Sequence, residues 1–395
     1  MKKECVLVWG NGNVLKQNIY WIKQIYHIAG ITDSDRKTTE VSKKLYVKEE
    51  ALRLEFDKIL IASFYWREII DYLVHIQKIK REKIKIFSDE FHQERRVEFG
   101  DRNKNVTFYI LRAHWDERKN GFFNFYERAA FAYHNAKRNG YELLVDMKNY
   151  YTEYAGLERY GKVNVWTDYF RQPSEYTLEE AYESQNVILS RFGDDFSNQA
   201  YLSNYAFGSV KYLVDTHQNL AKMHGCMQAS QELKHRLEKE EKKLNGKVLG
   251  VLARGTDMVS EMPGNHHIPM NPYEFAERVK IHMKQFGYEF IYLATEDENI
   301  FKVFQEKFSD ALLCTEQPRT VGRKGTVLMD IKFDRENDRY LRGMEYCLVI
   351  LMLSKCQGLI ANCFCGGVAG ALLLKTDGGG YREVEVMDLG MYPES

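Results

Sequence analysis

The sequence has no excess of charge of either sign, because its 56 basic and 56 acidic residues balance. This balance argues against a general nucleic-acid partner, since such proteins usually carry a basic surplus. The longest apolar run of the C-terminal part, Cys347–Leu353, is far shorter than the roughly 20 residues that span a bilayer. Met1 is followed by Lys-Lys-Glu and a strand-like segment, not by a signal peptide. We therefore expect a cytoplasmic protein, and leave peripheral association with the inner membrane open.

Several catalytic and structural motifs are also missing. The seven cysteines are odd in number and contain no Cys-x-x-Cys pair, so we expect reduced, buried thiols. His266 and His267 are adjacent, which is not a metal-ligand spacing on one face, and no Asp-x-Asp triad suits Mg²⁺ and a diphosphate. A Gly-x-Ser-x-Gly nucleophile elbow is absent. These absences favour chemistry that uses neither a metal nor a serine nucleophile.

The chain of 395 residues is long enough for two or three domains. Strand-like and helix-like segments alternate along it, which predicts α/β units with parallel sheets. We predict three sections, over residues 1–95, 105–240 and 245–395. The expected strands include Cys5–Trp9, Lys58–Ala62, Lys83–Phe87, Val106–Leu111, Tyr141–Asp146, Val248–Ala253, Phe290–Ala294 and Gly358–Ala361, and the expected helices include Val14–His27, Phe122–Asn139, Tyr273–Phe286, Asn299–Phe308 and Arg342–Lys355.

One apolar run, Val248–Ala253, ends in Arg254, Gly255, Thr256 and Asp257. A buried strand that delivers a guanidinium and a carboxylate at its C-terminal end is a common way to build an anion site in an open α/β sheet. The planar fork of a guanidinium suits phosphate oxygens. The alternative is an ordinary strand exit that carries a surface ion pair.

Two other strand ends of the third section carry polar or glycine-rich sequence. Thr295 and Asp297 follow the strand Phe290–Ala294, where they can hold a ribose or a base edge, or cap the helix that follows. Cys363-Phe-Cys-Gly-Gly-Val368 joins a strand to a helix. Its successive backbone amides and the helix dipole predict a diphosphate cradle, and tight strand–helix packing is the alternative.

The N-terminal turn Gly10-Asn-Gly12 resembles part of a dinucleotide-binding loop, and Asp33 follows about 20 residues later, where a ribose-binding acid is expected. Leu15 stands at the third position of this pattern, where Gly or Ala normally allows close helix–strand packing. Three interpretations remain open: a nicotinamide site, a site for another nucleotide-sugar or coenzyme-like ligand, and a structural module with a degenerate loop. We favour the last.

The motif Gly250–Asp257, the step His267-Ile-Pro269, the strand end Leu293–Asp297 and the helix Gly343–Cys356 occur in an order that resembles the donor-binding lobe of the fucosyltransferase-like superfamily. The pattern is most similar to α-1,6-fucosyltransferases, including the nodulation type, and to protein O-fucosyltransferases, over roughly residues 105–385. The resemblance implies an α/β fold: a GT-B-like pair of α/β lobes preceded by a small Rossmann-like domain. Residues 105–240 then form the acceptor-side lobe, and residues 245–395 the nucleotide-sugar-binding lobe.

The resemblance also implies an activity, the inverting, metal-independent transfer of fucose from GDP-fucose to a bacterial surface glycan. Arg254 matches the arginine that contacts the donor β-phosphate, and Asp257 matches the acid that closes the motif. Three further positions, His267, Thr295 and Asp297, fall among the implied donor contacts. The turn that contains Cys365, Gly366 and Gly367 matches a serine-containing turn near the diphosphate.

This sequence departs from the family pattern at four places. Leu252 replaces the first histidine of the motif, Gly255 its second basic residue, Val349 a helix acid, and Cys365 with Gly366 the serines of the diphosphate turn. A related NDP-sugar is therefore an alternative donor.

A general base should take the proton of the acceptor hydroxyl. Glu261, four residues after Asp257, is our candidate, and Asp116 and Glu117 are its rivals. Two other functions stay open: a nicotinamide-dependent sugar-nucleotide oxidoreductase that uses the N-terminal loop, and a non-catalytic nucleotide-sugar-binding protein.

Overall fold

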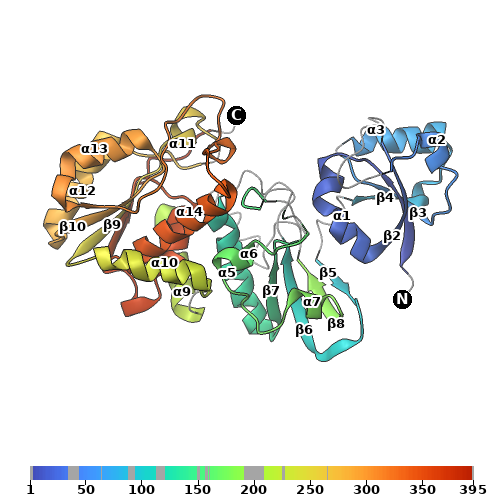
Figure 1. Cartoon of the computed structure of the whole chain (residues 1–395), viewed down its shortest axis with the longest axis horizontal. Helices are drawn as coiled ribbons and strands as arrows, with labels where there is room; N and C mark the ends of the chain where they lie inside the picture. Colours follow the sequence, from blue (N-terminus) through green and yellow to red (C-terminus); the bar gives the residue numbers. More distant parts are fainter. Residues whose placement is uncertain are drawn as a thin grey trace.

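Three α/β units follow one another along the chain in a computed structural model (Figure 1). The structure describes residues 3–33, 44–63, 65–87, 94–112, 121–148, 152–155, 159, 161–190, 209–224, 227–264 and 266–393. In Figure 1 the first unit is blue, the second is mostly green and the third runs from yellow to red. The predicted fold class, a pair of α/β lobes preceded by a small Rossmann-like domain, is confirmed.

The first unit is a parallel sheet of four strands in the order β2-β1-β3-β4. Its helix α1 ends at Ile25 and β2 begins at once, so the predicted helix Val14–His27 was two residues too long. The elements are β1 (Glu4–Trp9), α1 (Asn13–Ile25), β2 (Tyr26–Thr32), α2 (Lys48–Ala51), β3 (Lys58–Ile61), α3 (Trp66–Asp71), a π-helical turn (Tyr72–Ile76) and β4 (Ile84–Ile86).

The second unit is a mixed sheet in the order β5-β8-β6-β7, in which only β5 runs antiparallel to its neighbour. The sequence did not predict β5 or β8. The elements are β5 (Arg95–Val97), β6 (Arg102–Arg112), α5 (Phe122–Asn139), β7 (Glu142–Asp146), α6 (Trp166–Tyr169), α7 (Leu178–Ala181) and β8 (Ser184–Leu189).

The third unit is a parallel sheet of five strands in the order β11-β10-β9-β12-β13. Counted from β9, the order is 3-2-1-4-5, the arrangement of nucleotide-binding sheets. The strand order reverses between β9 and β12, and ligands of such sheets bind at the carboxyl ends of the strands there. The elements are β9 (Val248–Leu252), α11 (Asp257–Ser260), α12 (Pro272–Phe286), β10 (Phe290–Ala294), α13 (Glu298–Phe308), β11 (Leu312–Leu313), α14 (Asp338–Lys355), β12 (Gly358–Ala361), α15 (Gly366–Leu374) and β13 (Val384–Val386).

The second and third units share a buried interface built on α15. Its Gly370 lies against the ring of Phe123 in α5, and a Cβ at Gly370 would come within 2.2 Å of that ring. The helices α9 (Val210–His224) and α10 (Gln231–Glu240) pack against α15 and α14 of the third unit. The described part of the chain has no helix long and apolar enough to cross a membrane. The predicted domain limits of 95, 240 and 245 stay predictions.

Candidate active site

The backbone of Arg254 is held at the point where the strand order reverses. Asn362, the residue after β12, accepts a hydrogen bond from the Arg254 amide (2.9 Å) and donates one to the Arg254 carbonyl (2.8 Å). The Asn362 side chain is buried, at 1% exposure, and therefore ties the ends of β9 and β12 together. Sequence reasoning missed Asn362, because its partner lies 108 residues away.

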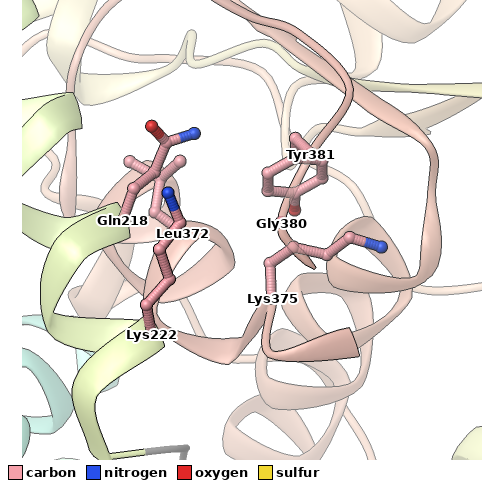
Figure 2. Close-up of a pocket in the computed structure, with 6 residues that line it drawn as sticks. All are labelled: Gln218, Lys222, Leu372, Lys375, Gly380 and Tyr381. Atoms are coloured by element: carbon pink, nitrogen blue, oxygen red, sulfur yellow. The ribbon is translucent and has the colours of Figure 1, made fainter. Parts of the chain in front are cut away.

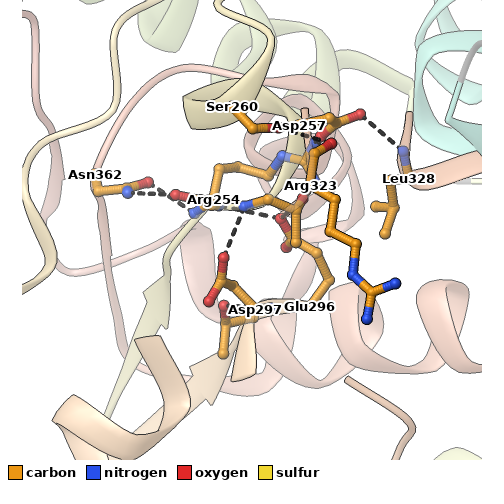
Figure 3. Close-up of polar contacts among 11 residues, drawn as sticks. Arg254, Asp257, Ser260, Glu296, Asp297, Arg323, Leu328 and Asn362 are labelled. Carbon is orange, nitrogen blue, oxygen red and sulfur yellow. Dashed lines mark hydrogen bonds and ion pairs between the residues drawn. The ribbon is translucent and has the colours of Figure 1, made fainter. Parts of the chain in front are cut away.

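The Arg254 side chain lies between two carboxylates (Figure 3). Its guanidinium is 3.2 Å from Asp257 Oδ1 and 3.0 Å from Glu296 Oε1, and all three side chains are largely buried. Burial acts to lower the pKa of the guanidinium, but the charges of Glu296 and Asp257 outweigh burial and raise the pKa above its ordinary value. Arg254 is therefore a fixed cation. It does form an ion pair, but the pair is largely buried and not the surface pair foreseen as the alternative.

Thr256, between these charged residues, has a strained backbone. Its φ is 44° and its ψ is −119°, which is an outlier for a β-branched residue. Asp297 holds it there, since Asp297 Oδ2 accepts the Thr256 amide at 2.7 Å. The Thr256 hydroxyl donates to Glu296 Oε1 (3.1 Å), and the Gly255 amide donates to the same oxygen (3.1 Å). Such strain persists where the surroundings over-determine it, which is common at functional sites.

Asp297 also caps α13. Its Oδ1 accepts the amides of Asn299 (2.7 Å) and Ile300 (3.1 Å), so the capping alternative is observed. Thr295 is buried, and its hydroxyl accepts the Asp297 amide (3.2 Å). A nucleotide contact by Thr295 or Asp297 stays a prediction, and the carboxylate of Asp297 already serves both α13 and Thr256.

The glycine-rich turn after β12 brings the N-terminus of α15 to Arg254. Burial raises the pKa of the Cys365 thiol, while Arg254 and the amides of Val368 and Gly367 act to lower it. The thiol therefore lies where both a guanidinium and helix amides favour negative charge. A Cβ at Gly367 would come within 2.9 Å of Leu252 Cδ1, so tight packing also requires this glycine.

Gly366 and Tyr346 stand beside this turn. The nearest atom to a Cβ at Gly366 would be the Asn124 amide nitrogen of α5, at 3.4 Å, so packing alone does not require a glycine there. The Tyr346 hydroxyl would be 3.5 Å from a Cβ at Gly367, and burial raises the pKa of this phenol well above its ordinary value. Tyr346 therefore adds a neutral hydroxyl beside the turn. Its role was not foreseen, although it lies inside the Gly343–Cys356 segment.

His267 is buried without hydrogen bonds. The side chain is 4% exposed, and neither ring nitrogen has a hydrogen-bond partner in the part of the chain that the structure describes. Its ring lies edge-on to Phe364, with centroids 5.9 Å apart, and Phe364 belongs to the turn before α15. His267 is thus close to that turn, and both of its ring nitrogens are buried there.

Burial of His267 sets an expected pH effect. Burial lowers its pKa below the ordinary 6.5, so the unfolded chain holds this proton more tightly than the folded chain. The stability it contributes is complete above pH 6.5 and is lost as the pH falls below that value. In urea unfolding between pH 8 and pH 5, we expect this loss to disappear in His267→Phe. The control is His266→Phe at the exposed neighbouring position, which should still lose stability as the pH falls. If the free energy of unfolding of His267→Phe fell with pH as steeply as that of the unmodified protein, His267 would not be the group responsible.

Glu261, the candidate base, is exposed at the end of α11. Its Oε1 accepts the amide of Gly325 at 2.5 Å, while Asp257 Oδ2 accepts the amide of Leu328 at 3.1 Å. Both acids therefore hold the segment 320–328 against the Arg254 motif. The rival bases, Asp116 and Glu117, lie outside the described residues.

The N-terminal loop is tied together by its own groups. Asp33 Oδ2 accepts the backbone amide of Asn11, which lies between Gly10 and Gly12. Gly10 has a φ of 118°, and a Cβ there would meet the carbonyl oxygen of Ala62 at 2.4 Å. Gly12 precedes α1 and has open space around it. The Asp33 carboxylate thus supports the loop from within, and the three interpretations of this loop stay predictions.

A small pocket lies near the C-terminal end of α15, away from the Arg254 motif (Figure 2). The Lys375 ammonium extends away from Gln218 and Lys222, and lies over the Tyr381 ring at 5.3 Å from its centroid. No group of three or more His, Cys, Asp or Glu residues suited to a metal occurs in the described ranges. The lining of this pocket contains none of the predicted donor residues of the third unit, so the pocket is separate from them.

Neither a protein-family model nor a curated protein matches the sequence. Similar solved structures include the α-1,6-fucosyltransferase NodZ soaked with GDP-fucose, with a TM-score of 0.40 and 13% identity over 68% of this chain and 92% of that one. NodZ from Bradyrhizobium has a TM-score of 0.41 and 12% identity over 72% and 95%. POFUT1 in complex with GDP-fucose has a TM-score of 0.39 and 10% identity over 72% and 99%. NodZ is one of the kinds of enzyme that the sequence motifs resemble.

Proposed function

We propose that the chain is a glycosyltransferase that transfers fucose, or a related sugar, from GDP-fucose or another NDP-sugar to a glycan acceptor. The observation that carries this proposal is the convergence of Arg254, Asn362 and the N-terminus of α15 where β9 and β12 end. A guanidinium and helix amides at this position of the sheet suit a diphosphate. We place the reaction in the biosynthesis of a bacterial surface polysaccharide, at the cytoplasmic side of the membrane.

The proposed chemistry follows from charge. Breaking the sugar–phosphate bond leaves negative charge on the diphosphate, which Arg254 and the amides of Gly366 and Gly367 would stabilise without a metal. Asp257 positions Arg254 through the contact at 3.2 Å. Glu261 would take the proton of the acceptor hydroxyl while its oxygen bonds to the anomeric carbon and the bond from that carbon to the diphosphate breaks, a single displacement that inverts the configuration. His267, Thr295, Asp297 and Cys365 would line the rest of the donor site.

Nucleotide binding tests the proposal directly. GDP should raise the melting temperature more than UDP, ADP or NAD does. A ligand at 100 times its Kd adds about 2.7 kcal/mol to the free energy of unfolding, and at equal concentration a nucleotide that binds more weakly adds less. The measurement is thermal shift at equal nucleotide concentrations, followed by GDP release from GDP-fucose. Asp33→Asn is the control, since it alters the N-terminal loop alone and should leave the GDP shift unchanged. Stabilisation by NAD alone would contradict the proposal and favour the oxidoreductase.

A further inference from the structure

The site around Arg254 has more negative than positive charge. Arg254 contacts Asp257 at 3.2 Å and Glu296 at 3.0 Å, and Asp297 follows directly. Asp297 accepts the Thr256 amide at 2.7 Å, so the motif holds one cation and three carboxylates before any ligand arrives. A diphosphate brings further negative charge, and like charges repel strongly where burial lowers the effective dielectric constant. Binding of a diphosphate here calls for a second cation.

The segment 320–328 lies against the Arg254 motif and can supply that cation. A Cβ at Gly322 would come within 2.6 Å of the Thr256 carbonyl oxygen, so the two backbones are in contact. The Ser260 hydroxyl lies 3.5 Å from the carbonyl oxygen of Arg323, and Gly325 donates to Glu261 at 2.5 Å. These contacts fix residue 323 beside α11, one residue away from the contact with Thr256.

Arg323 is the arginine of this segment, and its guanidinium is available to a ligand. Its side chain is exposed, and no ion pair or side-chain hydrogen bond is recorded for it among the described residues. In Figure 3 its guanidinium extends away from the Arg254 side chain. Other arginines are engaged: Arg319 lies 3.9 Å from the centroid of the Phe301 ring, and Arg335 is paired with Glu345.

We propose that Arg323 is a donor-binding residue that turns onto the diphosphate and, together with Arg254, offsets the three carboxylates. This inference rests on the proposed function, since it assumes a nucleoside diphosphate at Arg254. The guanidinium binds two oxygens of one phosphate at once, and its long side chain turns without any change in the backbone. The contact is made to the second phosphate of the ligand, so it discriminates a diphosphate from a monophosphate.

The test compares GDP with GMP by isothermal titration calorimetry. In Arg323→Gln we expect GDP to bind about 10- to 100-fold more weakly, because a hydrogen bond to a charged group is lost, and GMP to bind almost unchanged. Arg323→Lys should recover part of the GDP affinity. Lys324→Gln is the matched control, since it removes the same charge from the next exposed position and should leave GDP binding intact.

The outcomes separate this inference from the proposed function. If the unmodified protein binds no GDP, the proposed function is wrong. If it binds GDP and Arg323→Gln binds GDP equally well, the proposed function stands and the role of Arg323 is wrong. The role of Arg323 would also be wrong if Arg323→Gln weakened GDP and GMP binding equally, or if Lys324→Gln weakened GDP binding more than Arg323→Gln does. Melting temperatures within about 2 °C of the unmodified protein show that the exposed substitutions leave the fold intact.

Discussion

Replacing Arg254 with Gln should lower sugar transfer about 10²- to 10³-fold and abolish stabilisation by GDP. The guanidinium is the cation nearest the proposed diphosphate, and its loss leaves Asp257 and Glu296 facing the ligand without compensation. The ion pairs of Arg254 with Asp257 and Glu296 are largely shielded from water, so the loss of transfer in Arg254→Gln should persist in moderate salt. The measurements are GDP release from GDP-fucose at saturating acceptor and thermal shift with GDP.

The matched control for this variant is Arg278→Gln. Arg278 lies on α12 and also pairs with a carboxylate, Glu385, but it is half-exposed and its partner stands on the edge strand β13. Arg278→Gln should retain sugar transfer and the rise in melting temperature that GDP causes. If Arg254→Gln retained both properties as well, Arg254 would have no part in donor binding.

Replacing Asn362 with Ala should weaken both the fold and the site. The change leaves the amide and the carbonyl of Arg254 without partners, and each such group costs about 1–3 kcal/mol when water cannot reach it. It also removes both side-chain bonds between Asn362 and Arg254, which leaves the bond from the amide of residue 362 to the Leu252 carbonyl (3.1 Å), so Arg254 is held less firmly. We expect a lower urea midpoint and a GDP affinity reduced by at least about tenfold, measured 20 °C below the melting temperature.

Asn271→Ala separates these two effects. Asn271 caps α12 by accepting the Tyr273 amide at 3.0 Å, so its loss lowers stability by about 0.5–2 kcal/mol without touching Arg254. It should leave GDP affinity unchanged. An Asn362→Ala variant that bound GDP as tightly as Asn271→Ala would show that the link between the two strand ends does not serve the site.

Elements with clear end signals were predictable from the sequence. The predicted helix Phe122–Asn139 is α5, residue for residue, because Gly121 precedes it and Gly140 ends it with a φ of 69°. The strand β8 was missed, since its first half, Ser-Gln-Asn, has no apolar residue. β5 is only three residues long and begins with two arginines, so its pairing with β8 depends on tertiary contacts that no local pattern records.

The candidate site was predictable where its residues share one segment. Arg254 and Asp257 stand three residues apart and form an ion pair, which the sequence offered as the alternative to a phosphate site and placed at the surface, where the structure has it largely buried. Asn362 was missed because its hydrogen bonds to Arg254 span 108 residues. The contacts of the segment 320–328 were missed for a similar reason, since they join backbone amides to Asp257 and Glu261, and amides leave no mark in a sequence.

The close approach of Gly255 to Asp297 limits which substitutions position 255 tolerates. A Cβ there would come within 2.5 Å of Asp297 Oδ2 and 2.8 Å of Asp297 Cβ, so no larger residue fits while Asp297 is present. Asp297 in turn caps α13, and losing that cap costs about 0.5–2 kcal/mol. A second arginine beside Arg254 would therefore require a prior change at Asp297 that carries its own loss of stability. A single substitution at position 255 would therefore disturb Asp297 and its cap of α13.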